Sequence, residues 1–280
     1  MLSALMATTA AACFGVANFL GGVASRKDTA LAVTANAHMM GAVLMAVAVT
    51  VWPGAAVTAS DVAWGAFAGV TGGAAVVALY AALALGRMGI VGPLTAAISA
   101  ALPAIYDIAS GTALRPVTAT GIALALVAVG VVSAGGDEES RAAMPLRAVL
   151  LSAAAGTGFS ATLIALSFTG EGSGFVPLLS ARVVSAVLLG GLSIARTHRY
   201  LVDPCARRPA FGSGMVDSLA NIALITAIRT GPLAVVAVLG GLHPVVTMLL
   251  ARVFLGERLR GVQRAGVAVA LVAVVMTAMP

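Results

Sequence analysis

The sequence predicts an all-α, polytopic membrane protein with ten transmembrane helices. Hydrophobic residues make up 60% of the 280 positions, charged residues make up 9%, and the mean hydropathy is +1.06. The apolar residues form unbroken runs of about 20, which is the length a helix needs to cross a bilayer. Transmembrane barrel strands alternate apolar and polar residues instead. Because lipid offers no partners to backbone polar groups, these runs must be helices.

The first half of the chain holds five of the runs, each bounded by charged or turn-forming residues. Arg26-Lys27-Asp28 follows the first run, and Pro53-Gly54 follows the second. The first run has no basic residue before it, so we expect a retained helix and not a cleaved signal peptide. The predicted helices are 2–24, 30–51, 62–85, 89–111 and 117–134.

The second half holds five more runs after a polar break at 135–145. That break carries three consecutive acids, and a second long polar break covers 196–209. The predicted helices are 146–168, 174–195, 210–229, 232–254 and 261–279.

The two halves resemble each other in sequence. Residues 114–129 and 259–274 are identical at ten of sixteen positions, and the same offset of 145 aligns Phe14 with Phe159. We therefore predict a first repeat at 1–136, a central linker at 137–145 and a second repeat at 146–280. The alternative is a likeness that comes only from shared composition. Five helices are an odd number, so the second copy enters the membrane from the opposite side, and inverted repeats are typical of secondary transporters.

Basic residues are distributed unequally between the two sets of loops. Loops after odd-numbered helices carry twelve lysines and arginines, and loops after even-numbered helices carry only Arg115 and Arg229. Positive charge favours the cytoplasmic side, so the odd loops are expected to be cytoplasmic and both termini external. Trp52 and Trp64 then fall at the outer interface, where aromatic residues gather.

Several polar side chains are predicted to lie at membrane depth, where they are costly and indicate a pathway or site. Arg182 and Asp217 differ in predicted depth by roughly 8 Å, a gap that a long arginine nearly closes. Two interpretations remain open: a structural ion pair, or a guanidinium that binds a substrate carboxylate or phosphate. The predicted substrate-binding residues are Asn18, His38, Arg182, Asp217, Asn221 and His243.

The two histidines of this group have two interpretations as well. His38 and His243 could accept a coupling proton, or each could be a neutral side chain that is hydrogen-bonded within the bundle. Asp107, near the end of its helix, could instead be a solvated residue at the mouth of the pathway. Prolines distort helices, so we expect the fourth and ninth helices to bend or partly unwind and to act as gates at Pro93, Pro103, Pro232 and Pro244.

Other activities find little support in the sequence. It contains no GxxxxGK[ST], HExxH or GxSxG pattern, and its three histidines lack metal-ligand spacing. The net charge of +6 lies in loops beside helices and does not indicate nucleic-acid binding. We expect no cofactor, no metal and no enzymatic activity. Two rivals to transport remain: a non-transporting scaffold, and an intramembrane enzyme with nucleophile and base at one depth.

Several motifs resemble the EamA domain of the drug/metabolite transporter superfamily. They are Phe14-Gly15-Val16-Ala17-Asn18-Phe19, the stretch from Pro177 to Arg182, Leu242-His243-Pro244-Val245-Val246-Thr247 and Leu255-Gly256-Glu257-Arg258-Leu259. The resemblance covers the chain as two EamA repeats. It implies that the first four helices of each half line a central cavity, with the fifth helix outside them.

The resemblance also implies ATP-independent export or exchange of small metabolites, amino acids, nucleotide sugars or drugs. Two features depart from the pattern: Gly111-Thr112-Ala113-Leu114 replaces the acidic turn in the first copy, and many members place both termini in the cytosol. We predict a secondary active transporter in a bacterial inner membrane. Its expected partners are the bilayer, a small-molecule substrate, a coupling proton and a second copy of the chain in a homodimer.

Overall fold

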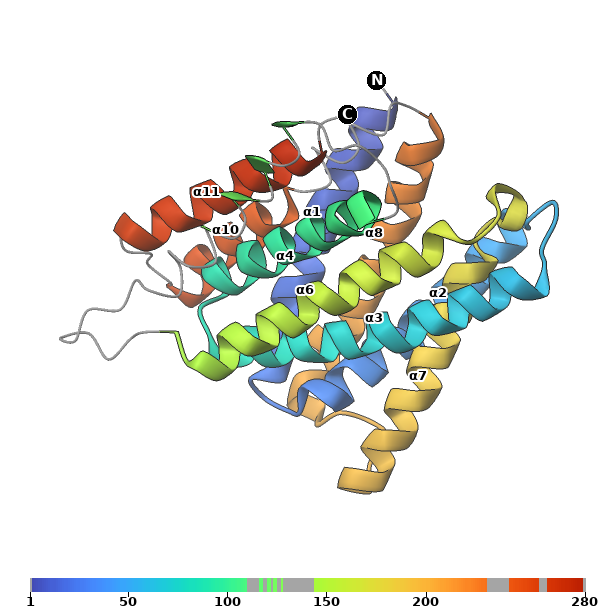
Figure 1. The fold of residues 1–280 in the computed structure, drawn as a ribbon. Coiled ribbons are helices and arrows are strands. Elements are labelled where there is room, and N and C mark those ends of the chain that lie inside the picture. Colours follow the sequence, from blue (N-terminus) through green and yellow to red (C-terminus); the bar gives the residue numbers. More distant parts are fainter. Residues whose placement is uncertain are drawn as a thin grey trace.

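The computed structural model describes residues 2–109, 144–230, 242–256 and 261–278, with isolated positions between 116 and 127. Within these residues every regular element is helical, and the helices form one bundle (Figure 1). The elements are α1 (Leu2–Ser25), α2 (Ala30–Val51), α3 (Ala59–Leu85), α4 (Met88–Ala109), α6 (Leu146–Ser167), η1 (Glu171–Ser173), α7 (Val176–Thr197), α8 (Pro204–Thr230), α10 (His243–Leu255) and α11 (Gly261–Ala278).

Six of the described helices are long and apolar enough to cross a membrane: α1, α2, α3, α6, α7 and residues 204–227 of α8. The bounds of α1, α2, α4 and α6 agree with the predicted bounds to within two residues. The predicted helix 117–134, the linker 137–145 and Pro232 fall wholly or mostly outside the described residues. The predicted all-α class is therefore confirmed over the described part, and the total of ten helices stays a prediction.

The start of α8 differs from the prediction. We expected a polar break as far as residue 209, but α8 begins at Pro204 and continues through Pro209. Asp203 caps this end, because its carboxylate accepts from the Cys205 amide at 3.2 Å and its carbonyl accepts from the Ala206 amide at 2.9 Å. An acidic cap followed by proline in the first turn favours helix initiation. Arg207 and Arg208 therefore belong to a helix and not to a loop.

The helices of the first half pack mainly on helices of the second half. The most extensive contacts join α1 to α8 and α3 to α6, followed by α3 with α7 and α2 with α7. Small residues permit these approaches. A Cβ on Gly214 of α8 would lie 2.0 Å from the Ala37 carbonyl oxygen of α2, so that position accepts only glycine in this packing.

Polar contacts tie the two halves together at both ends of the bundle. At one end, the Asp203 amide donates to the Asp28 carboxylate at 2.7 Å, which joins the α7–α8 and α1–α2 links. At the other end, the Gly170 amide donates to Asp61 at 2.7 Å, and the Ala56 amide donates to the Gly172 carbonyl at 3.2 Å. The links after α1 and α7 thus share one end, and the links after α2 and α6 share the other.

Candidate functional site

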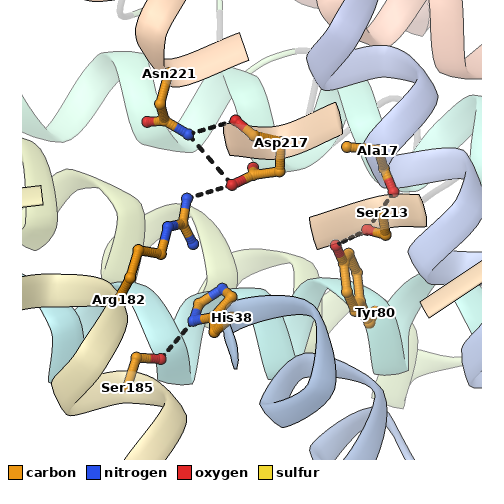
Figure 2. A network of polar contacts seen from close by, with 8 residues as sticks. All are labelled: Ala17, His38, Tyr80, Arg182, Ser185, Ser213, Asp217 and Asn221. Carbon is orange, nitrogen blue, oxygen red and sulfur yellow. Dashed lines mark hydrogen bonds and ion pairs between the residues drawn. The ribbon is translucent and has the colours of Figure 1, made fainter. Parts of the chain in front are cut away.

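A charged pair lies in the interior between α7 and α8. The Arg182 guanidinium donates to the Asp217 carboxylate, and the two side chains keep only 14% and 21% of their exposure. Asn221, one turn further along α8, donates its amide to the Asp217 carbonyl at 2.8 Å and to the same carboxylate at 3.2 Å. The predicted proximity of Arg182 and Asp217 is therefore observed, and Asn221 helps to fix the carboxylate (Figure 2).

Gly41 of α2 gives this pair room. A Cβ there would lie 3.4 Å from Arg182 Cδ and 2.9 Å from the Ser218 hydroxyl. The Ser218 side chain is fully buried, and its oxygen has no hydrogen-bond partner among the described residues. The backbone of α2 thus forms one wall of the site, and a larger residue at position 41 would press on the arginine.

His38 joins the site from α2. It is 5% exposed, and its Nδ1 shares a hydrogen bond of 2.5 Å with the hydroxyl of Ser185, which is three residues after Arg182 on α7. Arg182 is the charged neighbour of the His38 ring (Figure 2). Helix α2 from the first half and helix α7 from the second therefore present their polar side chains to the same interior region.

A second polar group lies beside the first, and the sequence analysis missed it. The Tyr80 hydroxyl of α3 shares a hydrogen bond of 2.6 Å with Ser213 of α8, and Ser213 donates to the Ala17 carbonyl of α1 at 2.9 Å. Tyr80 is 3% exposed and Ser213 is fully buried. Their only sequence signal is the presence of hydroxyls in apolar runs, which is common in membrane helices and usually reflects a bond to the residue's own helix.

The remaining predicted binding residues lie outside this network. Asn18 is half-buried on α1, next to Ala17, and its side chain makes no hydrogen bond within the described part of the chain. His243 begins α10, and its ring meets the Phe14 ring edge-on at 6.1 Å between centroids. Neither residue is among the side chains brought together in Figure 2.

The predicted gate prolines have different surroundings. Helix α4 is helical through both Pro93 and Pro103. A bend at these prolines, and their role as gates, stay predictions. Pro244 occupies the first turn of α10 and is buried, and its Cβ lies 3.5 Å from the position that a Cβ on Gly92 of α4 would take. The two proline-bearing helices thus contact each other. Asp107 lies in α4.

An intramembrane hydrolase would need a nucleophile and a base within reach, and Ser185 and His38 meet that distance. In a serine–histidine pair the histidine must become a cation, and a carboxylate hydrogen-bonded to it normally stabilises that cation. Among the described residues the carboxylate in this region, Asp217, is paired with Arg182, and the hydrogen-bond partner of His38 is Ser185 alone. The described contacts therefore do not supply the third member that such a pair needs.

An apolar pocket of about 330 Å³ lies between α3 and α7, close to this polar region. Ser185 is its polar lining residue, and Val70, Leu188 and Leu192 on its rim are exposed. The pocket therefore opens from the outside of the bundle toward the serine that bonds His38.

Comparison with known proteins finds a family model that matches the second half of the chain. Residues 146–279 match the family described as the EamA-like transporter family. A solved structure titled only "Crystal structure of protein" matches with a TM-score of 0.63 at 17% identity, and the match covers 99% of this chain and 96% of that one. At that identity the likeness is one of fold, but it extends over both halves. No curated protein matches the chain.

Proposed function

We propose that this chain, which belongs to the EamA-like transporter family through residues 146–279, moves a small charged metabolite across the membrane as a secondary transporter. The family and the apolar helices make it an integral, multi-pass membrane protein of the drug/metabolite transporter type. The observation that carries the proposal is the Arg182–Asp217 pair, enclosed between helices of both halves beside His38 and Asn221.

An ion pair of this kind is expensive to bury. Replacing a buried pair by apolar residues is often neutral or stabilising, so such a pair is poor evidence for a purely structural role. A guanidinium also offers a planar fork that matches a carboxylate or a phosphate. In our proposal the anionic group of the substrate takes the place of Asp217 on Arg182.

The displaced Asp217 then needs a new partner, because an unpaired buried carboxylate is costly. Either a proton neutralises it, or a cationic group on the substrate pairs with it. The proposed cargo is therefore an anion that moves with a proton, or a zwitterion. Moving one charge through 100 mV is worth about 2.3 kcal/mol, roughly a fiftyfold gradient, so no ATP is required.

Alternating access would use two inverted five-helix halves. The predicted counterparts in the two halves are α1 and α6, α2 and α7, α3 and α8, and α4 and α10. Helix contacts support this arrangement, because a contact between two helices recurs between their two counterparts. The α1–α8 contact corresponds to α6–α3, the α3–α7 contact to α8–α2, and the α4–α6 contact to α10–α1. In this scheme α4 and α10, which meet at Pro244 and carry prolines at matched positions, act as the gates.

The first test separates substrate binding from structural pairing at Arg182. A thermal-shift screen of amino acids, organic acids and phosphorylated metabolites on purified protein identifies a stabilising ligand, since a ligand at a hundredfold its Kd adds about 2.7 kcal/mol. Uptake of that ligand into proteoliposomes is then measured for the wild type, Arg182→Gln, Asp217→Asn and the double variant.

The double variant decides between the two roles. Arg182→Gln alone strands a buried carboxylate and should cost about 3–5 kcal/mol of stability. Arg182→Gln with Asp217→Asn removes both charges and should recover most of it. We expect transport and ligand stabilisation to stay lost in this restored double variant. Recovery of transport together with stability would make the pair structural and favour the scaffold interpretation.

A further inference from the structure

The turn between α7 and α8 carries a dense group of cations. Arg196 ends α7, Arg199 lies in the turn, and Arg207 and Arg208 lie in the first turns of α8. All four are exposed. The α1–α2 link adds the exposed Lys27, whose Nζ donates to the Cys205 carbonyl at 3.4 Å. These five residues are called the basic patch.

The backbone that carries the basic patch is held in place at several points. His198 adopts a left-handed conformation that ends α7, and the Arg199 carbonyl accepts from Ser193 and Thr197, each at 3.2 Å. Val202 is buried at 1% exposure, and the Asp203 amide is bound by Asp28. The cations are therefore presented by a fixed surface.

Only two acids lie on these two segments, and both are already engaged. Asp28 accepts from the amides of Thr29 and Asp203. Hydrogen bonds from the Cys205 thiol and amide hold the pKa of the Asp203 carboxyl below its usual value, so it is ionised. Its contact with Arg199 at 3.9 Å is between exposed groups and is weak. Five cations of the basic patch thus lie beside two acids, and the patch keeps a net positive charge.

Two observations connect this charge to a membrane surface. The basic patch lies directly at the ends of two membrane-spanning helices, α7 and α8. Leu201, between the two groups of arginines, is 45% exposed, and Leu192 and Ile194 are exposed one to two turns before the turn. Cations interleaved with exposed apolar side chains suit a lipid interface, where both the headgroups and the upper acyl region have partners.

We propose that the basic patch binds the headgroups of anionic phospholipids. The phosphate oxygens would accept from Arg207 and Arg208, and Leu201 would enter the acyl boundary. Each basic residue near an anionic membrane surface strengthens binding about fivefold. This inference requires only that α7 and α8 span the membrane. It does not depend on the identity of any transported substrate.

The test compares lipid retention by full-length protein in nanodiscs of phosphatidylcholine mixed with phosphatidylglycerol. Native mass spectrometry counts the lipids of each kind that stay bound. We expect the wild type to retain phosphatidylglycerol preferentially. Arg207→Gln with Arg208→Gln should lower this preference by about thirtyfold. The matched control is Arg147→Gln with Arg252→Gln, two exposed arginines on α6 and α10, and it should keep the preference.

Three further measurements make the result decisive. Arg207→Lys with Arg208→Lys keeps the charge and should retain phosphatidylglycerol, and rising salt should weaken the wild-type preference without any mutation. If Arg147→Gln with Arg252→Gln lowered the phosphatidylglycerol preference as much as Arg207→Gln with Arg208→Gln, the preference would depend only on the overall charge of the protein. That result would overturn the proposal. Stabilisation of detergent-solubilised protein by inorganic phosphate to the same extent as by phosphatidylglycerol would assign the patch to a free anion instead.

Discussion

Ser185 and Ser152 are both buried serines in membrane helices, but their hydroxyls have different partners. The hydroxyl of Ser185 bonds His38 on another helix, whereas Ser152 donates to the Ala148 carbonyl one turn back on its own helix. Loss of the Ser185 hydroxyl leaves a buried ring nitrogen of His38 without a hydrogen-bond partner. Loss of the Ser152 hydroxyl leaves no group unsatisfied, because the Ala148 carbonyl keeps its backbone hydrogen bond. This difference gives a test of the polar network that needs no substrate.

Ser185→Ala is expected to lower the free energy of unfolding by about 1–3 kcal/mol, the usual cost of an unsatisfied buried group. Ser152→Ala should cost less than about 1 kcal/mol, because its carbonyl partner keeps its helical bond. Thermal unfolding of both variants in the same detergent measures the difference. Equal shifts would mean that the His38 contact contributes nothing to the fold.

The same contrast explains which site residues could be predicted from the sequence. His38, Arg182, Asp217 and Asn221 stand out in apolar runs because ionised or amide groups are rare there. Tyr80, Ser185 and Ser213 did not stand out. Hydroxyls in helices commonly bond the carbonyl four residues back, as Thr34 does with Ala30. Composition therefore cannot reveal which hydroxyl reaches a neighbouring helix, since that depends on packing between distant segments.

At the scale of helices, close approach depends on single glycines. A Cβ on Gly69 of α3 would lie 2.4 Å from the Ala181 carbonyl oxygen of α7, while a Cβ on Gly191 of α7 would meet nothing within 4 Å. Gly69→Ala should therefore force the helices apart and cost about 1–3 kcal/mol. Gly191→Ala should be neutral or stabilise by up to about 1 kcal/mol, as alanine favours helix. Denaturant unfolding compares them, and a neutral Gly69→Ala would mean that α3 and α7 pack loosely.

Hydrophobic length predicts helices well and helix starts less well. The prediction for α2, 30–51, coincides with the observed helix because Thr29 caps its start and Pro53-Gly54 follows its end. For α8 the apolar run starts later than the helix, and the six-residue difference comes from Asp203 and Pro204, whose capping signal is local and independent of hydropathy. A hydropathy pattern predicts which residues lie within the hydrocarbon layer, whereas capping residues determine where the helix begins.

At the scale of the whole molecule, the carboxylate–amide contacts at the two ends are of one kind. Asp28, in the link after α1, accepts from Asp203 in the link after α7. At the other end, Asp61 in the first turn of α3 accepts from Gly170 in the link after α6. The predicted inverted repeat would bring matching segments of the two halves together at both ends in this way. Rings also gather at the second end, where Trp64 stacks on Phe168 at 4.6 Å and Trp52 meets Phe175 edge-on at 6.2 Å.

These two ends should lie on opposite sides of the membrane, with the basic one in the cytoplasm. Val57 and Arg199 are suited to test this, because one lies at each end and both are exposed. In a background with Cys13→Ala and Cys205→Ala, an impermeant maleimide added to intact cells should label Val57→Cys at once and Arg199→Cys only after permeabilisation. The reverse pattern would invert the orientation and place the basic patch outside. Labelling of both from the same side would contradict the crossing of the bilayer by the helices between them, and with it the two-ended architecture on which alternating access depends.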